Sequence, residues 1–379
     1  MLSLALLVCC DDFNSINYGR LSKTKLRLIH HQTHMTSYRS SFISCDFDFD
    51  AKGKHYGAAH LDYSNDEGVS RVFPIPIVNI SNGDGPTVLL TAGNHGNEDE
   101  GQLILRRLIN EVSPEEIQGR LIVLPALNYP AVRANTRTSP LDQGNLNRCF
   151  PANKVAGPTD AIARFVVDVL LPLADAGVDL HAGGASAKYV NTTFLCACED
   201  EIIFRKSFDL AKAFNAPYMY VVDGRGAPTG FDPAAHAAKV PFISTELGGG
   251  YIDPDAIEVG YEGVRNVLAH LGIITIPESR TGSSEITYLD ASKSESVVYA
   301  PYEGLFESHV DVGEEVEAGQ TAGVLYSLDE VDRTPTVLKF PASGVVCAKH
   351  VSARVVNGTR TYITVRTATE RTILTPVDD

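Results

Sequence analysis

Two residue types that bind metals stand three residues apart just after an apolar run of strand length. The run begins at Thr87 and stops at a small-residue turn, and His95 and Glu98 follow it. An imidazole nitrogen and a carboxylate oxygen are both good zinc ligands, and this spacing at a helix entry lets them converge on one ion. Taken alone, the pair fits a turn histidine and a capping glutamate equally well.

A catalytic zinc site needs a third protein ligand and a base. His181 ends a second strand-like run and completes a two-histidine, one-carboxylate set that leaves the fourth position to water. Asp179 lies on the same side of that strand, where it either orients a ligand or bonds to backbone. Glu246 ends another apolar strand before three glycines. Because burying such a carboxylate is costly, we interpret it as the general base.

A polar stretch over residues 128–153 is too long and too poor in apolar residues for a core element, which favours a functional loop. Within it, Arg137 is the candidate partner for a developing oxyanion. Asn147 and Arg148 offer an amide and a planar fork that suit a substrate carboxylate. The alternative for each arginine is an ordinary surface residue.

The fold class expected for the chain is α/β. Strand-like and helix-like segments alternate from residue 46 to about 280, which predicts a mixed sheet flanked by helices. Residues 277–296 have linker composition apart from a short run at 286–289. Short strands with glycine punctuation follow and predict a small all-β domain. The expected units are therefore an extension (1–45), a catalytic domain (46–280) and a β-rich C-terminal domain (281–379).

The first 34 residues differ from the rest of the chain. Their apolar start lacks the basic flank and the small-residue end of a secretion signal, and it is too short to span a bilayer. We interpret Met35 as the natural start, with a disordered extension before it. A cleaved signal is the competing interpretation.

Composition limits the classes of partner and compartment. The formal net charge of −15 argues against nucleic acid and against an anionic membrane surface as partners. The seven cysteines show no CxxC spacing and no disulfide density, which favours a cytoplasmic protein. Cys196 and Cys198 are interpreted as core residues. A homo-oligomer is left open.

Four motifs together carry a resemblance to a known family. They are Gly93-Asn-His-Gly-Asn-Glu98, Asn145-Leu-Asn-Arg-Cys-Phe-Pro151, Asp179-Leu-His181 and Thr245-Glu-Leu-Gly248. In this order they resemble the succinylglutamate desuccinylase/aspartoacylase family, a branch of the zinc carboxypeptidase-like fold, over roughly residues 46–275. Segments 82–86, 137–142, 214–217 and 244–250 look closest to the members that deacetylate N-alpha-acetyl-L-2,4-diaminobutyrate in ectoine degradation. The C-terminal segment resembles the barrel-sandwich fold of biotinyl and lipoyl domains without their carrier lysine.

The resemblance implies a role for each candidate. One zinc ion per subunit would be held by His95, Glu98 and His181, and Glu246 would act as general base and then acid. Arg137 would polarise the scissile carbonyl, although its loop is longer than in aspartoacylases, so that Arg133 is an alternative. The substrate's α-carboxylate would be held by Asn147 and Arg148. Ala152 departs from the family's usual glycine at this turn.

The function expected is therefore a zinc-dependent deacylase acting on a small N-acyl amino acid. A metallocarboxypeptidase, a deacylase for a different N-acyl amino acid and a non-enzymatic metal-binding protein are the alternatives. If the substrate carries a diaminobutyrate side chain, its ammonium should meet an acidic group, for which Asp223 and Asp232 are the candidates.

Overall fold

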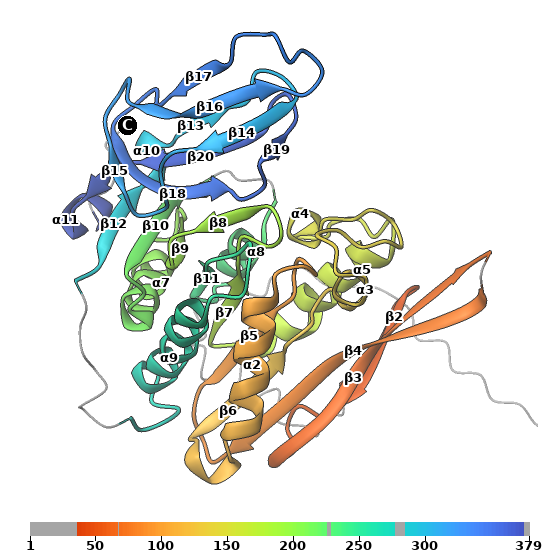
Figure 1. The fold of residues 1–379 in the computed structure, drawn as a ribbon. Coiled ribbons are helices and arrows are strands. Elements are labelled where there is room, and N and C mark those ends of the chain that lie inside the picture. The colour runs from red at the N-terminus through yellow and green to blue at the C-terminus, as the bar shows by residue number, and fades with distance from the viewer. Residues whose placement is uncertain (1–35, 67, 226–228, 277–284, 375–379) are drawn as a thin grey trace, which may run out of the picture.

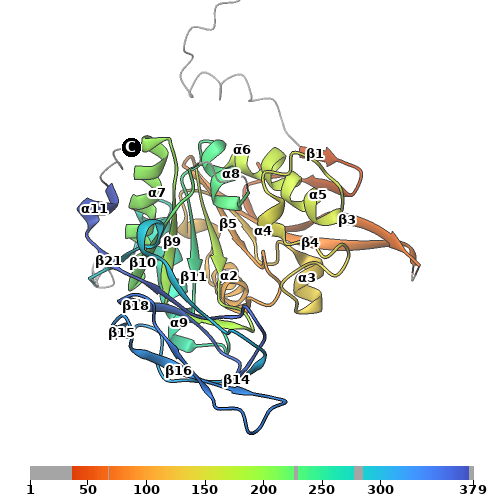
Figure 2. The same ribbon diagram turned by 90° about the horizontal axis from the view of Figure 1, so that it is seen from above.

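The computed structural model describes residues 36–66, 68–225, 229–276 and 285–374 (Figures 1 and 2). The first 34 residues, and with them the question of the natural start, lie outside these ranges. None of the helices in the described part of the chain has the length and apolarity that crossing a bilayer requires.

A twelve-stranded mixed sheet forms the body of the molecule. Its strands, in spatial order, are β1 (Thr36–Arg39), β2 (Ile43–Phe47), β3 (Gly53–Asn65), β4 (Gly68–Asn82), β6 (Gly119–Leu124), β5 (Thr87–Ala92), β7 (Ala176–His181), β11 (Phe242–Glu246), β9 (Thr192–Ala197), β10 (Tyr218–Asp223), β12 (Thr287–Asp290) and β21 (Thr367–Ala368). This confirms the mixed α/β class.

Three neighbouring parallel strands organise the functional part of this sheet. β5 pairs with β7 and β7 pairs with β11, with Glu246 directly beside His181 in the register. Because parallel strands end at the same edge, the turn after β5 and the last residues of β7 and β11 meet there. Every residue of β5 and β7 is buried, as expected for strands covered on both faces.

Helices cover both faces of the sheet. On one face the apolar residues of α2 (Asp99–Glu111), α7 (Glu201–Phe214) and α9 (Pro254–His270) pack on alternate residues of β5 and β7, among them Leu90 and Val178. On the other face α5 (Pro158–Phe165) and α8 (Phe231–Ala237) pack around Leu89 and Phe242. The remaining helical segments are η1 (Pro114–Glu116), α3 (Tyr129–Ala134), α4 (Leu146–Cys149), η2 (Val166–Leu170), α6 (Leu171–Leu173), α10 (Ala291–Ser294) and α11 (Glu370–Leu374).

The C-terminal segment forms two further antiparallel sheets around a core of its own. One contains β13 (Ser296–Tyr299), β20 (Arg360–Val365), β18 (Gly344–His350) and β15 (Glu315–Val316), and β8 (Ala187–Tyr189) joins it. The other contains β17 (Thr336–Lys339), β16 (Thr321–Ser327), β14 (Gly304–Ser308) and β19 (Arg354–Val355). In Figure 1 the blue strands of these two sheets lie together at one end of the molecule, and the green β8 lies beside β18.

The two parts exchange strands, so the expected division at residue 281 is not clean. β12 and β21 come from the C-terminal segment and extend the large sheet next to β10. In return β8, which follows His181 in the chain, pairs with β18, placing Tyr189 beside Ala348. The segment that follows the histidine is thereby anchored to the C-terminal sheets.

Three local expectations differ from the structure. Residues 36–45, expected in the extension, form β1 and part of β2 in the sheet. The predicted linker contains α10, in addition to the short run at 286–289 that overlaps β12. The long loop contains α3 and α4, which bury Leu146 and are followed by the buried Phe150.

We predict that Gly101→Ala destabilises the protein. Gly101 of α2 lies so close to β7 that a β-carbon would stand 2.6 Å from the backbone oxygen of Leu180. Relieving this clash means moving α2, and overpacking of this kind costs about 1–3 kcal/mol, more than the roughly 1 kcal/mol that alanine adds to helix propensity. Urea unfolding measures the difference. Leu103→Ala on the exposed side of α2 is the control, and an equal stability of both variants would contradict the prediction.

Candidate active site

Two histidines and one glutamate converge at the edge where β5, β7 and β11 end. Nδ1 of His95 lies 2.8 Å from Oε1 of Glu98, and Nδ1 of His181 lies 2.8 Å from Oε2 of the same carboxylate. Their ligand atoms all lie within 4.8 Å of one another, and all three residues are buried. The structure therefore brings together the three expected ligands, and we refer to them below as the acceptor cluster.

Nε2 of each histidine, the ring nitrogen that faces away from Glu98, has a partner of its own. Nε2 of His95 lies 3.1 Å from Oδ1 of Asn145, and Nε2 of His181 lies 2.9 Å from Oδ2 of Asp179. Both oxygens are acceptors, so both Nε2 atoms carry the hydrogen, and in the neutral rings both Nδ1 atoms carry lone pairs. A metal-ligating histidine is typically oriented in this way by a carboxylate or carbonyl behind it.

Asp179 is itself held on its other side. Thr91 donates its hydroxyl to Oδ1 at 2.6 Å, and the amide of Asn94 donates to Oδ2 at 3.0 Å. Asp179 is completely buried. Although burial alone would raise its pKa, the charge of His181 and these hydrogen bonds hold the pKa of Asp179 below its usual value.

The chemistry of the acceptor cluster suits a divalent cation. Two imidazole nitrogens and a carboxylate face one another, and this is the two-histidine, one-carboxylate set of catalytic zinc sites. Burial alone would raise the pKa of Glu98 and lower that of His181. Their mutual attraction outweighs burial, so the pKa of Glu98 is lowered and that of His181 is raised. The residues present therefore fit a metal ion.

Glu246 supplies an unpaired carboxylate beside this cluster. It lies across from His181 in the register of β7 and β11, and its Oε2 is buried without a hydrogen-bond partner among the described residues. Burial raises the pKa of Glu246 well above its usual value, and the negative charge of Glu98 raises it further. A carboxyl group whose pKa is raised in this way can both accept and return a proton near neutral pH.

The two arginine candidates for the oxyanion partner, Arg137 and Arg133, differ in their contact with the acceptor cluster. Nη1 of Arg137 lies 3.0 Å from Oε1 of Glu98, with about half of its side chain exposed. Arg133, the alternative, is exposed in the last turn of α3. Arg137 is therefore the one that reaches the acceptor cluster.

The candidate residues for binding the substrate's α-carboxylate, Asn147 and Arg148, lie on α4, directly after Asn145 and Leu146. Oδ1 of Asn147 accepts a hydrogen bond of 3.0 Å from the backbone N–H of Phe231, which ties α4 to the start of α8. The side chain of Arg148 is exposed and, within the described ranges, forms no hydrogen bond or ion pair. Its guanidinium is thus available for a ligand. No described contact joins Arg148 to the acceptor cluster itself.

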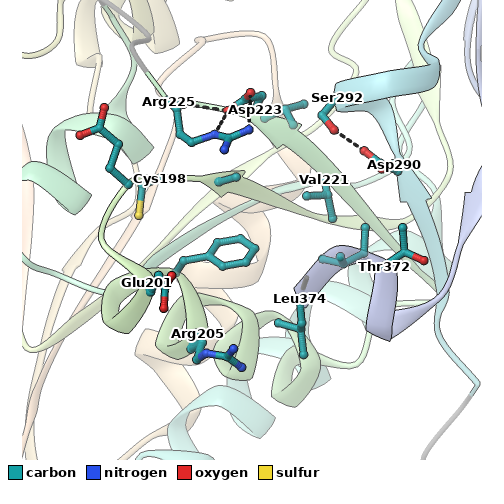
Figure 3. A pocket seen from close by; sticks show the side chains of 15 residues that line it. Cys198, Glu201, Arg205, Val221, Asp223, Arg225, Asp290, Ser292, Thr372 and Leu374 are labelled. Atoms are coloured by element: carbon teal, nitrogen blue, oxygen red, sulfur yellow. Dashed lines mark hydrogen bonds and ion pairs between the residues drawn. The ribbon is translucent and has the colours of Figure 1, made fainter. Parts of the chain in front are cut away.

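The two acidic candidates for a cationic side chain lie in different surroundings. Asp223 forms a two-pronged ion pair with Arg225 and helps to line a cavity of about 170 Å³ (Figure 3). No member of the acceptor cluster lines this cavity. Asp232 is buried near the start of α8, and its Oδ2 accepts a hydrogen bond of 2.7 Å from Ser244 of β11.

Three residues that help to orient the ligands were not predicted from the sequence, namely Thr91, Asn94 and Asn145. Thr91 lies one residue before the end of β5, and its period-2 position on the strand puts it on the same face as Asp179. Asn94 and Asn145 lie inside motifs that were recognised, yet nothing in their spacing indicates which histidine or carboxylate they bind.

The chain is similar to known proteins of one family. A family model of the succinylglutamate desuccinylase/aspartoacylase catalytic domain matches residues 84–271. N-alpha-acetyl-L-2,4-diaminobutyric acid deacetylase of Halomonas elongata is 35% identical over 318 residues, which are 84% of this chain and 93% of the relative. The product-bound ectoine utilization protein EutE (DoeB) of Ruegeria pomeroyi superposes with a TM-score of 0.81 at 34% identity, covering 86% of this chain and all of that one. Succinylglutamate desuccinylase/aspartoacylase of Rhodobacter sphaeroides gives a TM-score of 0.80 at 35% identity, with 87% and 100% covered.

Hydrolysis by an activated water is the chemistry that a metal-binding acceptor cluster and a neighbouring free carboxylate support, so the class is that of metal-dependent hydrolases. Within this class, the chain belongs to the succinylglutamate desuccinylase/aspartoacylase family, whose members are deacylases.

We predict that Asp179→Asn weakens zinc binding about 10- to 100-fold, the usual effect of losing a carboxylate behind a ligating histidine. The reason is that a neutral amide stabilises the Nε2–H of His181 less well and makes Nδ1 a weaker donor. Competition with a chromophoric chelator measures the affinity. Asp223→Asn, remote from the acceptor cluster, is the matched control, and equal zinc affinities of the two variants would refute the prediction.

We also predict that Asp232→Asn stabilises the protein above pH 6. Burial raises the pKa of Asp232 from 3.8 to about 6. A folded-state pKa above the unfolded value means that wild-type stability falls as pH rises from about 4 to 6. The variant should therefore gain up to about 3 kcal/mol at pH 8 and little at pH 3.5. Urea unfolding of both proteins at the two pH values tests this, and a variant that is less stable at pH 8 would contradict it.

Proposed function

We propose that this chain is a zinc-dependent deacylase that hydrolyses N-alpha-acetyl-L-2,4-diaminobutyrate to acetate and 2,4-diaminobutyrate, a step of ectoine degradation. The observation that carries the reaction is the carboxylate of Glu246 beside the acceptor cluster, whose buried Oε2 has no hydrogen-bond partner among the described residues. The substrate is supported by the similarity to the Halomonas elongata deacetylase and to the ectoine utilization protein.

Each residue of the site has its own role in the proposed hydrolysis. One zinc ion, held by His95, Glu98 and His181, would supply a Lewis acid that acidifies a water molecule and polarises the amide carbonyl. Glu246 takes the proton of the attacking water at its free carboxylate oxygen and passes it to the nitrogen of the leaving amino acid. The guanidinium of Arg137, next to Glu98, stabilises the negative charge that develops on the carbonyl oxygen.

The substrate is oriented by its α-carboxylate. Arg148 offers a planar pair of N–H donors that matches a carboxylate in two-pronged fashion, and it has no described partner to give up. The amide oxygen of Asn147 is already bonded to Phe231, which leaves its NH₂ group for the same carboxylate. Binding at this point holds the acyl amide toward the acceptor cluster.

The β-rich C-terminal segment has a supporting role in this proposal. Its β18 holds β8, which lies only a few residues beyond His181, so it shapes the surroundings of the site from that side. We propose a catalytic unit that begins at β1 and takes β12 and β21 from the C-terminal segment. Cysteine usage supports a cytoplasmic location, and a homo-oligomer stays open.

We predict that Glu246→Gln lowers kcat by about 10²- to 10⁴-fold, the contribution of a positioned proton-transfer group. Glutamine retains the shape of the side chain and cannot take up a proton, so zinc content should stay at one per chain. Steady-state kinetics and metal analysis on the same sample separate the two. Glu307→Gln, an exposed glutamate of β14, is the control. A variant with wild-type turnover would exclude this mechanism.

The substrate is tested by release of the free amino acid from four compounds, with and without chelator. These are N-alpha-acetyl-L-2,4-diaminobutyrate, N-acetyl-aspartate, N-succinyl-glutamate and a short peptide with a free C-terminus. We expect chelator-sensitive hydrolysis of the first, with kcat/KM well above the others. Preference for the second or third would leave a deacylase of different specificity, and preference for the peptide would indicate a carboxypeptidase.

A further inference from the structure

We propose that Asp232 recognises the positively charged side chain of the substrate, with its carboxylate as the partner of an alkylammonium group. The inference rests on the proposed function and goes beyond it, because it names the residue that separates a cationic substrate from neutral or acidic N-acyl amino acids.

Asp232 is buried, and only one of its two carboxylate oxygens has a hydrogen-bond partner among the described residues. The residue is 7% exposed, and Oδ2 accepts a hydrogen bond of 2.7 Å from Ser244. Oδ1 is buried and has no hydrogen-bond partner among the described residues. No lysine or arginine of the described chain forms an ion pair with it. Leaving an ionised oxygen in this state costs free energy, and a ligand that brings a positive charge removes that cost.

Its position relative to the reacting groups is set by β11. Ser244 and Glu246 are two residues apart on one strand, so they lie on the same face and about 6.6 Å apart along it. Ser244 holds Asp232, and Glu246 serves the leaving nitrogen in the proposed reaction. Ser244 is also beside Asp179 in the register of β7, whereas Glu246 is beside His181. Asp232, which Ser244 holds, is thus on the same face of the sheet as the acceptor cluster, two residues along β11 from the position of Glu246.

A second contact ties Asp232 to the part of the site that binds the α-carboxylate. The backbone N–H of Phe231, directly before Asp232, donates to Oδ1 of Asn147 at 3.0 Å. The candidate groups for the α-carboxylate and the side chain are therefore linked through the start of α8, and Ser244 links Asp232 to the strand that carries Glu246.

The spacing suits the diaminobutyrate skeleton. Its two nitrogens are separated by four bonds of about 1.5 Å each, so they lie roughly 5 Å apart when the chain is extended. With the α-nitrogen near Glu246, the side-chain ammonium reaches the region of Ser244 and Asp232. Burial raises the pKa of Asp232 to about 6 although the hydrogen bond from Ser244 lowers it, and the negative charge of the nearby Asp179 raises it further.

The other acidic candidate does not have these properties. Figure 3 shows Asp223 bonded to Arg225 in the cavity of about 170 Å³, and both of its oxygens accept from that guanidinium. An aspartate whose charge is already matched, in a cavity that the acceptor cluster does not line, offers no comparable attraction for an ammonium group.

The test compares two substrates of almost equal shape, N-alpha-acetyl-L-2,4-diaminobutyrate and N-alpha-acetyl-L-norvaline, in which a methyl group replaces the ammonium. The measured quantity is the ratio of their kcat/KM values for zinc-loaded wild type and Asp232→Asn. We expect the variant to lower this ratio about 10- to 100-fold, the worth of a charge-assisted hydrogen bond in a desolvated site. Asp223→Asn should leave the ratio at its wild-type value.

A binding measurement gives a second readout without turnover. Calorimetry with 2,4-diaminobutyrate and with norvaline should show the same loss of preference in Asp232→Asn. If both substrates lose activity equally in this variant, Asp232 acts only on structure and the inference is wrong. If wild type prefers the diaminobutyrate substrate and the variant keeps that preference, the inference fails while the proposed function stands. Wild-type inactivity on the diaminobutyrate substrate would overturn both.

Discussion

The rest of this structure depends on one constraint, which is to hold the three metal-binding groups of His95, Glu98 and His181 close together in a buried space. Nδ1 of His95, Nδ1 of His181 and the carboxylate of Glu98 face one another, and a positive charge, either a proton on His181 or a metal ion in its place, offsets the buried charge of Glu98. The fold holds them there through hydrogen bonds on the far sides of both rings. Asn145 and Asp179 fix which nitrogen faces inward, and Thr91 and Asn94 hold Asp179 in turn.

The order of strands explains how distant parts of the sequence reach one point. β5, β7 and β11 are adjacent and parallel, so a turn, a strand end and a carboxylate from three regions of the chain meet at a single edge. α2 must lie very close to this edge to place Glu98, which is why Gly101 faces Leu180 without room for a β-carbon. The C-terminal sheets contribute from the other side through the pairing of β8 with β18.

Much of this site was predictable from the sequence, because each ligand directly follows or ends an apolar strand and the motifs occur in a family-specific order. The orienting residues Asn94 and Asn145 were not, since their partners are fixed by tertiary contacts. The expected start at residue 46 missed β1 and part of β2, whose short alternating segments carry little signal until they pair with β3. The exchange of β8, β12 and β21 between the two parts was equally invisible, because pairing between segments far apart in sequence leaves no local pattern.

The most direct test of the account is a crystal structure of the zinc-loaded protein, with the metal located by its anomalous scattering. We predict one zinc ion per chain, bound by Nδ1 of His95, Nδ1 of His181 and the carboxylate of Glu98 at about 2.0–2.2 Å, with Nε2 of each histidine still bonded to Asn145 or Asp179. Zinc bound through the Nε2 atoms, or at the cysteines instead of this cluster, would contradict it.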